Sequence, residues 1–279
     1  MFPGADITEV AASRCAEPSP SSGSGHRIDI ENVTLEFAIA RGARALLVLR
    51  DVSCRIEPGC FTCIIGPSGC GKSTLLSVIA GYLAPSTGCV KIDDRKVSGP
   101  LSDRMMVFQQ STLFPWYTAA ENVAFGLTLR ARRRNYPMAE LRRRVSELIS
   151  LVGLDGFGDR YPHELSGGMR QRIEIARALA VNPEVLLMDE PLGALDALTR
   201  MLMQREILKI WQQTGKTIVF VTHDIGEAVI MADQVLVMSK RPATIREVIK
   251  IDIPRERSRE NPEVVRISHR IADLLNATF

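Results

Sequence analysis

The sequence has no apolar stretch long enough to cross a membrane. Its longest uncharged segment, residues 73–90, is interrupted by Gly81, Pro85 and Gly88, whereas a spanning helix needs about 20 mostly apolar residues. The N-terminal segment has neither a basic start nor an apolar block, so a secretory signal is not expected. These absences predict a protein that stays in the compartment where it is made.

The chain also has little excess charge. Its 35 Lys and Arg residues nearly balance 32 Asp and Glu residues, and the formal net charge of +3 is too small to indicate a nucleic-acid partner. By contrast, 46% of the residues are hydrophobic, which is enough to fill a core and argues against wholesale disorder. A chain of 279 residues accommodates one large domain or two small ones.

Cysteines are few and scattered, so packed thiols are expected rather than disulfides. Cys60 and Cys63 form a C-x-x-C pattern, which can indicate a redox or metal site. They lie across the start of an apolar strand, where side chains three residues apart point to opposite faces. A redox or metal role is therefore the less favoured interpretation.

The amino-acid composition and hydrophobic patterning of the chain change near residue 26. Residues 1–25 end in a run of Pro, Ser and Gly that has nothing to bury, which predicts a disordered N-terminal tail. Beyond it, short apolar runs typical of buried parallel strands alternate with helical patterns. The expected strands include 61–65, 105–108, 185–188, 218–221 and 235–238, and the expected helices include 73–80, 141–152, 169–180 and 194–213. This alternation predicts an α/β core.

A glycine-rich segment between an expected strand and helix fits the pattern G-x-x-x-x-G-K-[ST]. It consists of Gly66, Pro67, Ser68, Gly69, Cys70, Gly71, Lys72, Ser73 and Thr74, and is called the phosphate loop below. Its glycines let backbone amides turn toward phosphate oxygens, and the start of the helix favours anions. Lys72 can reach the β and γ phosphates, and the Ser73 hydroxyl can ligate Mg²⁺. The segment predicts a nucleoside triphosphate site.

A second strand ends in two carboxylates. Residues 185–188 are apolar and are followed by Asp189 and Glu190. A strand that brings Asp189 beside the phosphate loop can hold Mg²⁺, and Glu190 can orient and polarise an attacking water. Taken alone, the pair is equally consistent with an ordinary strand end capped by acids.

The sequence Leu165-Ser-Gly-Gly-Met-Arg-Gln171 identifies a family. Ser166, Gly167 and Gly168 can expose a hydroxyl and amides at a helix start, which makes a second phosphate receptor. The segment resembles the signature of ATP-binding cassette (ABC) ATPases. In that family the receptor closes on the ATP held by the opposite subunit, so the resemblance implies a dimer of cassettes.

Other segments resemble family elements in the expected order. Gln109 resembles the glutamine-loop residue that contacts Mg²⁺, and residues 194–196 resemble the dimer-contact D-loop. His223 resembles the switch histidine near the γ-phosphate, and Phe37 is the candidate for the aromatic that stacks on adenine. Singly, Gln109 could be a surface amide and His223 a structural histidine. Together they imply a catalytic set of Glu190, His223, Lys72 and Gln109, with Ser73, Gln109 and Asp189 at Mg²⁺.

The resemblance also implies an architecture. Residues 26–250 would form an ABC-type P-loop ATPase domain with a mainly parallel sheet, an antiparallel β subdomain and a helical subdomain at about 110–170. Residues 251–279 would form a short helical tail. The bound cofactors would be ATP and Mg²⁺, and the partner a second ABC ATPase subunit, with a homodimer as the expected form.

Residues 109–116, 190–199 and 222–228, together with Arg241-Pro, resemble the ATPases of bacterial nitrate, sulfonate and taurine importers. This resemblance implies ATP-driven solute uptake through separate permease subunits, an indirect link to a solute-binding protein, and a peripheral position on the cytoplasmic face of the inner membrane. The apolar segment 113–116 is then the candidate permease contact, although Phe114 and Trp116 could instead be core. The alternative function is a soluble ABC ATPase not coupled to transport.

Residues 130–144 contain seven arginines and one acid, Glu140. The apolar helical stripe leaves Arg142, Arg143 and Arg144 mostly away from the core, which favours a solvated helix face. Attraction to anionic lipid is the second interpretation, and RNA binding is the least favoured because no aromatic residues interleave.

Overall fold

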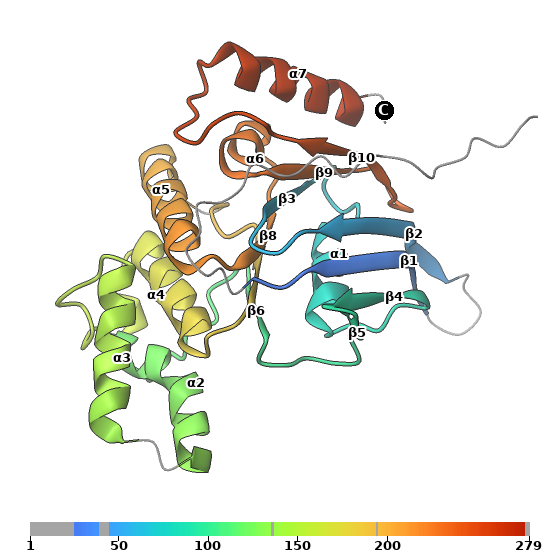
Figure 1. Ribbon diagram of the computed structural model, residues 1–279. Helices are drawn as coiled ribbons and strands as arrows, with labels where there is room; N and C mark the ends of the chain where they lie inside the picture. The colour runs from blue at the N-terminus through green and yellow to red at the C-terminus, as the bar shows by residue number, and fades with distance from the viewer. Residues whose placement is uncertain (1–24, 39–44, 135–136, 194, 277–279) are drawn as a thin grey trace, which may run out of the picture.

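The computed structural model describes residues 25–38, 45–134, 137–193 and 195–276. The expected N-terminal tail, residues 1–25, lies outside these ranges except for Gly25. The described chain is an α/β protein built on two sheets, as the apolar runs predict (Figure 1).

The larger sheet has six strands and is mainly parallel. Its strand order is β10-β9-β3-β8-β7-β6, and only the edge strand β10 runs antiparallel to its neighbour. The strands are β3 (Phe61–Ile65), β6 (Arg104–Val107), β7 (Val185–Asp189), β8 (Thr217–Val221), β9 (Gln234–Met238) and β10 (Ile245–Lys250). Every residue of β3, β7, β8 and β9 is buried because both faces of the sheet are covered.

The smaller sheet is antiparallel and has the order β2-β1-β4-β5. Its strands are β1 (Ile28–Phe37), β2 (Leu46–Ile56), β4 (Thr87–Ile92) and β5 (Arg95–Lys96). Its apolar face packs with helix α1 (Lys72–Ala80) against one face of the large sheet. Helix α1, which follows the phosphate loop, is thus packed in the core between the two sheets.

The other face of the large sheet is covered by helices. These are α4 (Gly167–Ala180), α5 (Ala197–Thr214), α6 (Ile225–Met231) and α7 (Pro262–Asn276). Together with α2 (Ala119–Arg134) and α3 (Met138–Leu151) they enclose the second core cluster. Figure 1 shows α2 and α3 beside α4 at one end of the molecule. Helices α2 and α3 fall within residues 110–170, the range expected for the helical subdomain, whereas α4 continues to Ala180.

Cys60 and Cys63 lie on opposite sides of the large sheet. Cys60 belongs to the core between the two sheets, whereas Cys63 belongs to the core under the helices. Burial raises the pKa of the Cys63 thiol well above its ordinary value. The placement of the two cysteines confirms the expectation that their side chains point to opposite faces.

Helix α5 begins later than the sequence pattern predicts. The expected start at residue 194 lies outside the described residues, and the helix begins at Ala197. Asp196 adopts an extended conformation and its carboxylate accepts a hydrogen bond from the backbone N–H of Thr199, which defines the N-terminus. At the other end Gly215 has φ 61°, so the predicted glycine stop is confirmed.

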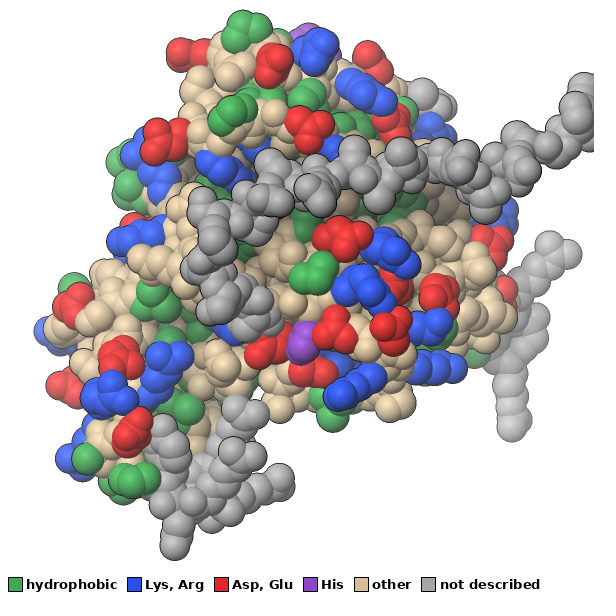
Figure 2. All heavy atoms as spheres, viewed as in Figure 1, with side chains coloured by type: hydrophobic (Ala, Val, Ile, Leu, Met, Phe, Trp, Pro, Cys, Tyr) green, Lys and Arg blue, Asp and Glu red, His purple; other side chains and the backbone are tan. Residues whose placement is uncertain are grey.

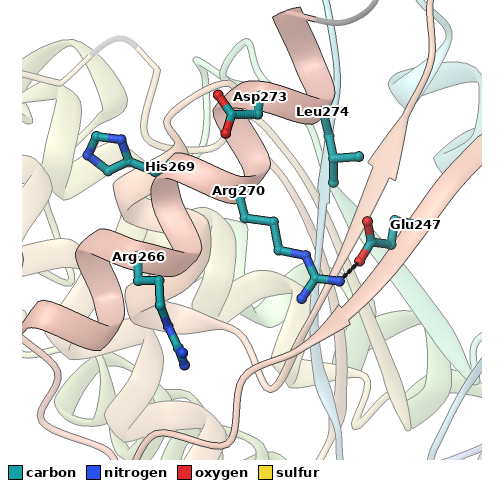
Figure 3. Close-up of a pocket in the computed structure, with 6 residues that line it drawn as sticks. All are labelled: Glu247, Arg266, His269, Arg270, Asp273 and Leu274. Atoms are coloured by element: carbon teal, nitrogen blue, oxygen red, sulfur yellow. Dashed lines mark hydrogen bonds and ion pairs between the residues drawn. The ribbon is translucent and has the colours of Figure 1, made fainter.

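The C-terminal helix α7 packs on the protein through Val264 and Ile271, which are buried. Figure 3 shows Arg270 reaching from α7 to Glu247 on β10, and the two side chains form an ion pair. The tail is therefore attached to the edge of the large sheet. Within the described ranges, no helix is both long and apolar enough to cross a membrane.

The arginine-rich part of α3 is paired with acids on the same helix. Arg143 contacts Glu140 and Glu147, and Arg144 contacts Glu147. These exposed i,i+3 and i,i+4 pairs are typical of a solvated face. Figure 2 shows acidic and basic side chains intermixed over the visible face of the molecule.

A single buried asparagine organises the turn that precedes α2. The amide of Asn122 is fully buried, accepts from the backbone N–H of Phe114 at 2.8 Å, and donates to the backbone oxygens of Phe114, Tyr117 and Thr118 at 3.0–3.2 Å. This amide therefore fixes the conformation of residues 114–118.

Asn122→Ala is expected to destabilise the protein. Each buried backbone group left without a partner costs about 1–3 kcal/mol, so the loss is expected to be at least of that size. Urea unfolding measures it, with the exposed Asn276 replaced by alanine as the matched control. Equal stability of the two variants would contradict this account of the turn.

Candidate functional site

The phosphate loop joins the carboxyl end of β3 to α1. Gly69 and Gly71 have φ values of 71° and 122°, which favour glycine. A Cβ at Gly71 would lie 2.9 Å from the Cγ1 of Val48, so a side chain there would collide with β2. Glycine at position 71 is therefore required both by its backbone conformation and by the approach of β2.

Lys72 is held inside this loop. Its side chain is 5% exposed, and its Nζ donates to the backbone oxygens of Gly66 at 3.0 Å and Pro67 at 3.2 Å. The loop thus keeps an ammonium group at its centre, where a phosphate group can take over these hydrogen bonds.

Ser73 and Asp189 meet across the boundary between α1 and β7. The Ser73 hydroxyl donates to the Oδ1 of Asp189 at 2.9 Å. Burial raises the pKa of Asp189, and the hydrogen bond from Ser73 partly opposes that shift. A hydroxyl and a carboxylate side by side fit Mg²⁺, which takes oxygen ligands and is commonly held by one or two carboxylates together with substrate phosphates.

Glu190 is the meeting point of the predicted catalytic residues. Its Oε2 lies 3.2 Å from the Nδ1 of His223 and 3.5 Å from the Nε2 of Gln109. Its Oε1 lies 3.9 Å from the Nζ of Lys72. The carboxylate of Glu190 thus lies between Lys72 of the phosphate loop on one side and Gln109 and His223 on the other.

Strand order explains this convergence. Gln109, Glu190 and His223 follow β6, β7 and β8, which are adjacent and parallel. Their carboxyl ends therefore lie at one edge of the sheet, the usual position of ligand sites in open α/β sheets. Glu190 also has φ 43°, an unusual conformation for a residue other than glycine.

The contacts that support the turn at His223 were not predicted from the sequence. Glu227 is 3% exposed, accepts from the Thr222 hydroxyl, and accepts from the Nε2 of Gln204 at 2.9 Å. Burial raises the pKa of Glu227. This network fixes the turn that presents His223. Thr222 and Glu227 lie within the segment 222–228, but Gln204 lies on α5, so the spacing along the chain gives no signal for the contact between them.

Arg241 is a second residue with an unpredicted contact. Its guanidinium donates to the backbone oxygen of Gly69, and so joins the loop after β9 to the phosphate loop. The two residues are 172 positions apart in the chain, which explains why the sequence pattern gives no signal for the contact.

The signature serine begins α4. Its hydroxyl accepts from the backbone N–H of Met169 at 3.3 Å, and its side chain is exposed. A Cβ at Gly168 would lie 2.8 Å from the Cγ2 of Thr199, so glycine lets α4 and α5 approach. Within the described part of the chain, no hydrogen bond or ion pair joins residues 165–168 to the phosphate loop.

Phe37 ends β1, pairs with Leu46 on β2 and is 38% exposed. Among the described residues, no ring contact joins Phe37 to the phosphate loop, and residues 39–44 lie outside the described ranges. Its role in adenine stacking stays a prediction.

The strand–loop–helix with a buried lysine, beside a second strand that ends in Asp-Glu, defines a P-loop nucleoside triphosphatase. Residues 49–193 match the family model for ABC transporters. The chain therefore belongs to the ABC transporter family and is an ATP-hydrolysing cassette of that family.

Relatives of this chain include named import proteins. It is 46% identical over 231 residues to the nitrate import ATP-binding protein NrtC of Synechococcus elongatus, covering 82% of this chain and 35% of that protein. It is 40% identical over 253 residues to the taurine import ATP-binding protein TauB of Jannaschia sp., covering 88% of this chain and 92% of that protein.

A solved structure agrees with the fold. The dimeric post-hydrolysis cassette MJ0796 bound to ADP and Pi matches with a TM-score of 0.71 and 34% identity, over 81% of this chain and 100% of that chain. The expected fold class, an ABC ATPase core with a mainly parallel sheet, is confirmed.

Proposed function

We propose that the protein is the ATP-hydrolysing subunit of an ABC importer that takes up a small anionic or zwitterionic solute of the nitrate, sulfonate or taurine type. The import proteins named above support the solute class. The observation that carries the proposal is the convergence of Lys72, Gln109, Glu190 and His223 at the carboxyl edge of the large sheet.

The proposed chemistry is water attack on the γ-phosphorus of ATP, which breaks its bond to the β–γ bridging oxygen and leaves ADP and phosphate. The phosphate loop holds the nucleotide, and Lys72 stabilises charge on the transferring phosphoryl group. Glu190 orients the water and accepts its proton, and His223 contacts the γ-phosphate. Ser73, Asp189 and Gln109 would hold Mg²⁺, which when bound neutralises phosphate charge.

The proposed active unit is a dimer, with a second copy of this chain as the expected partner. The dimeric state of the solved cassette described above supports this arrangement, in which the second receptor serves the partner's nucleotide. Each site would contain the phosphate loop of one subunit and Ser166, Gly167 and Gly168 of the other. Closure over two ATP molecules would move the attached permease subunits.

The proposed permease contact is an aromatic cluster after Gln109. The ring centroid of Phe114 lies 5.7 Å from that of Trp116 and 4.7 Å from that of Phe125. Trp116 is 67% exposed, which favours a role as an anchor for a partner helix. With this contact the protein would sit peripherally on the cytoplasmic face of the membrane, linked indirectly to a solute-binding protein.

Trp116→Ala is expected to weaken association with the permease while nucleotide binding is retained, because the side chain is exposed and remote from the phosphate contacts. Co-purification with tagged, co-expressed permease subunits measures the first property, and ATP titration the second. Leu101, which is 63% exposed and is not part of the aromatic cluster, provides the matched alanine control.

Failure of the unaltered protein to co-purify with any membrane subunit would contradict the importer assignment. It would support the soluble ABC ATPase instead. Equal co-purification of the Trp116 and Leu101 variants would contradict only the placement of the permease contact.

A further inference from the structure

Helix α4 is fastened to the segment that follows Gln109 by one buried acid. Glu174 lies on α4 with a side chain that is 2% exposed. Its Oε1 accepts from the backbone N–H of Thr112, and from the Thr112 hydroxyl at 3.3 Å. One carboxylate oxygen therefore binds both donors of a single residue.

Arg177, one turn further along α4, completes the contact. Its Nη1 donates to the backbone oxygen of Thr112 at 2.8 Å, and its Nη2 donates to the Thr112 hydroxyl. The same guanidinium lies 5.6 Å from the centre of the Phe114 ring, within cation–π range. All the polar groups of Thr112 are thus engaged by α4.

The contact places the carboxylate of Glu174 in the protein interior, which opposes folding unless the group is paired. The second carboxylate oxygen of Glu174, Oε2, is buried and has no hydrogen-bond partner among the described residues. Burial also raises the pKa of Glu174. An apolar residue at this position would leave the backbone N–H of Thr112 without its acceptor, and Arg177 without the carboxylate oxygen that lies 4.0 Å from its Nη2. The carboxylate therefore holds residue 112 to α4 through specific contacts that an apolar side chain could not make.

The position of Thr112 in the chain suggests what its contact with Glu174 does. It lies three residues after Gln109, which contacts Glu190, and two residues before Phe114 in the aromatic cluster. Glu174 itself is on the helix that Ser166 begins. The contact between Glu174 and Thr112 therefore links the helix that begins at Ser166 to the segment that runs from Gln109 to the aromatic cluster.

We propose that Glu174 is a positioning residue that makes the signature helix and the segment 112–116 move as one body when ATP closes the dimer. The movement of α4 toward the partner's nucleotide then carries the aromatic cluster with it. This inference rests on the proposed function, since it needs ATP-driven closure of two cassettes.

Trp116 provides the reporter. The chain has two tryptophans, and Trp211→Phe leaves Trp116 alone. In a Glu190→Gln background, which is expected to hold the closed dimer, addition of Mg-ATP is expected to change the emission of Trp116. The same samples are run on a sizing column, so that dimer formation is measured separately from the fluorescence.

Glu174→Ala in that background is expected to retain ATP binding and the ATP-dependent dimer but to lose the Trp116 response. Glu174→Gln keeps an acceptor oxygen for Thr112 and is expected to recover most of it. Should the alanine variant fail to fold, Thr112→Ala, which removes the shared hydroxyl, is expected to reduce the response.

An unchanged Trp116 response in Glu174→Ala would overturn the proposal, as would the lack of any response in the parent dimer. Absence of an ATP-dependent dimer in the parent would count against the proposed function instead. A response lost in Glu174→Ala and restored in Glu174→Gln would support the positioning role, because a purely structural role predicts parallel loss of dimer and signal.

Discussion

Glu190→Gln is expected to lower the ATPase rate by about 10²–10⁴-fold, the usual contribution of a general base. Its carboxylate lies next to His223 and Gln109 at the edge where the γ-phosphate is expected. The glutamine keeps the shape of the side chain but cannot accept the proton of the attacking water. ATP binding should survive, so the variant should accumulate as an ATP-bound dimer.

The rate is measured by phosphate release and the dimer by a sizing column with Mg-ATP. Glu206→Gln, on α5 and away from the catalytic edge, is the matched control and should hydrolyse ATP at the normal rate. A Glu190→Gln protein that remains monomeric at saturating ATP would argue against the two-subunit site. A normal rate would exclude Glu190 as the base.

Lys72→Ala is expected to weaken ATP binding by about ten- to a hundredfold. A hydrogen bond to a charged group contributes about 1.5–3 kcal/mol, and every 1.4 kcal/mol is about tenfold in affinity. The Nζ of Lys72 donates to two backbone oxygens of the phosphate loop, so the loop itself fixes the position of this group.

Calorimetric titration with ATP measures this affinity. Lys209→Ala removes an exposed lysine from α5 and should leave the affinity unchanged. Undiminished affinity in the Lys72 variant would remove the phosphate-loop assignment. The two variants separate two functions, since Lys72 acts in binding and Glu190 in the chemical step.

The fold could be predicted where the chain is locally consistent. The apolar runs at 61–65, 185–188 and 218–221 are strands because parallel strands covered on both faces need continuous apolar residues. The start of α5 was predicted too early, because the capping role of Asp196 outweighs the apolar pattern before it.

The site could be predicted where function depends on spacing along the chain. The phosphate loop and Asp189-Glu190 are local patterns, and the structure brings Ser73 within 2.9 Å of Asp189 as those patterns imply. Contacts between distant residues carry no such signal. Glu174 with Thr112 and Arg241 with Gly69 depend on which elements become neighbours, and strand order decides that.

Cross-linking between two different subunits tests the central claim most directly. One Glu190→Gln subunit carries Ser68→Cys in the phosphate loop, and another carries Ser166→Cys; both positions are exposed. With Mg-ATP and a short thiol-specific linker, a mixture of the two should give a covalent dimer that neither variant forms alone. A mixture that forms the ATP-dependent dimer on a sizing column, yet yields no such product, would contradict the shared site.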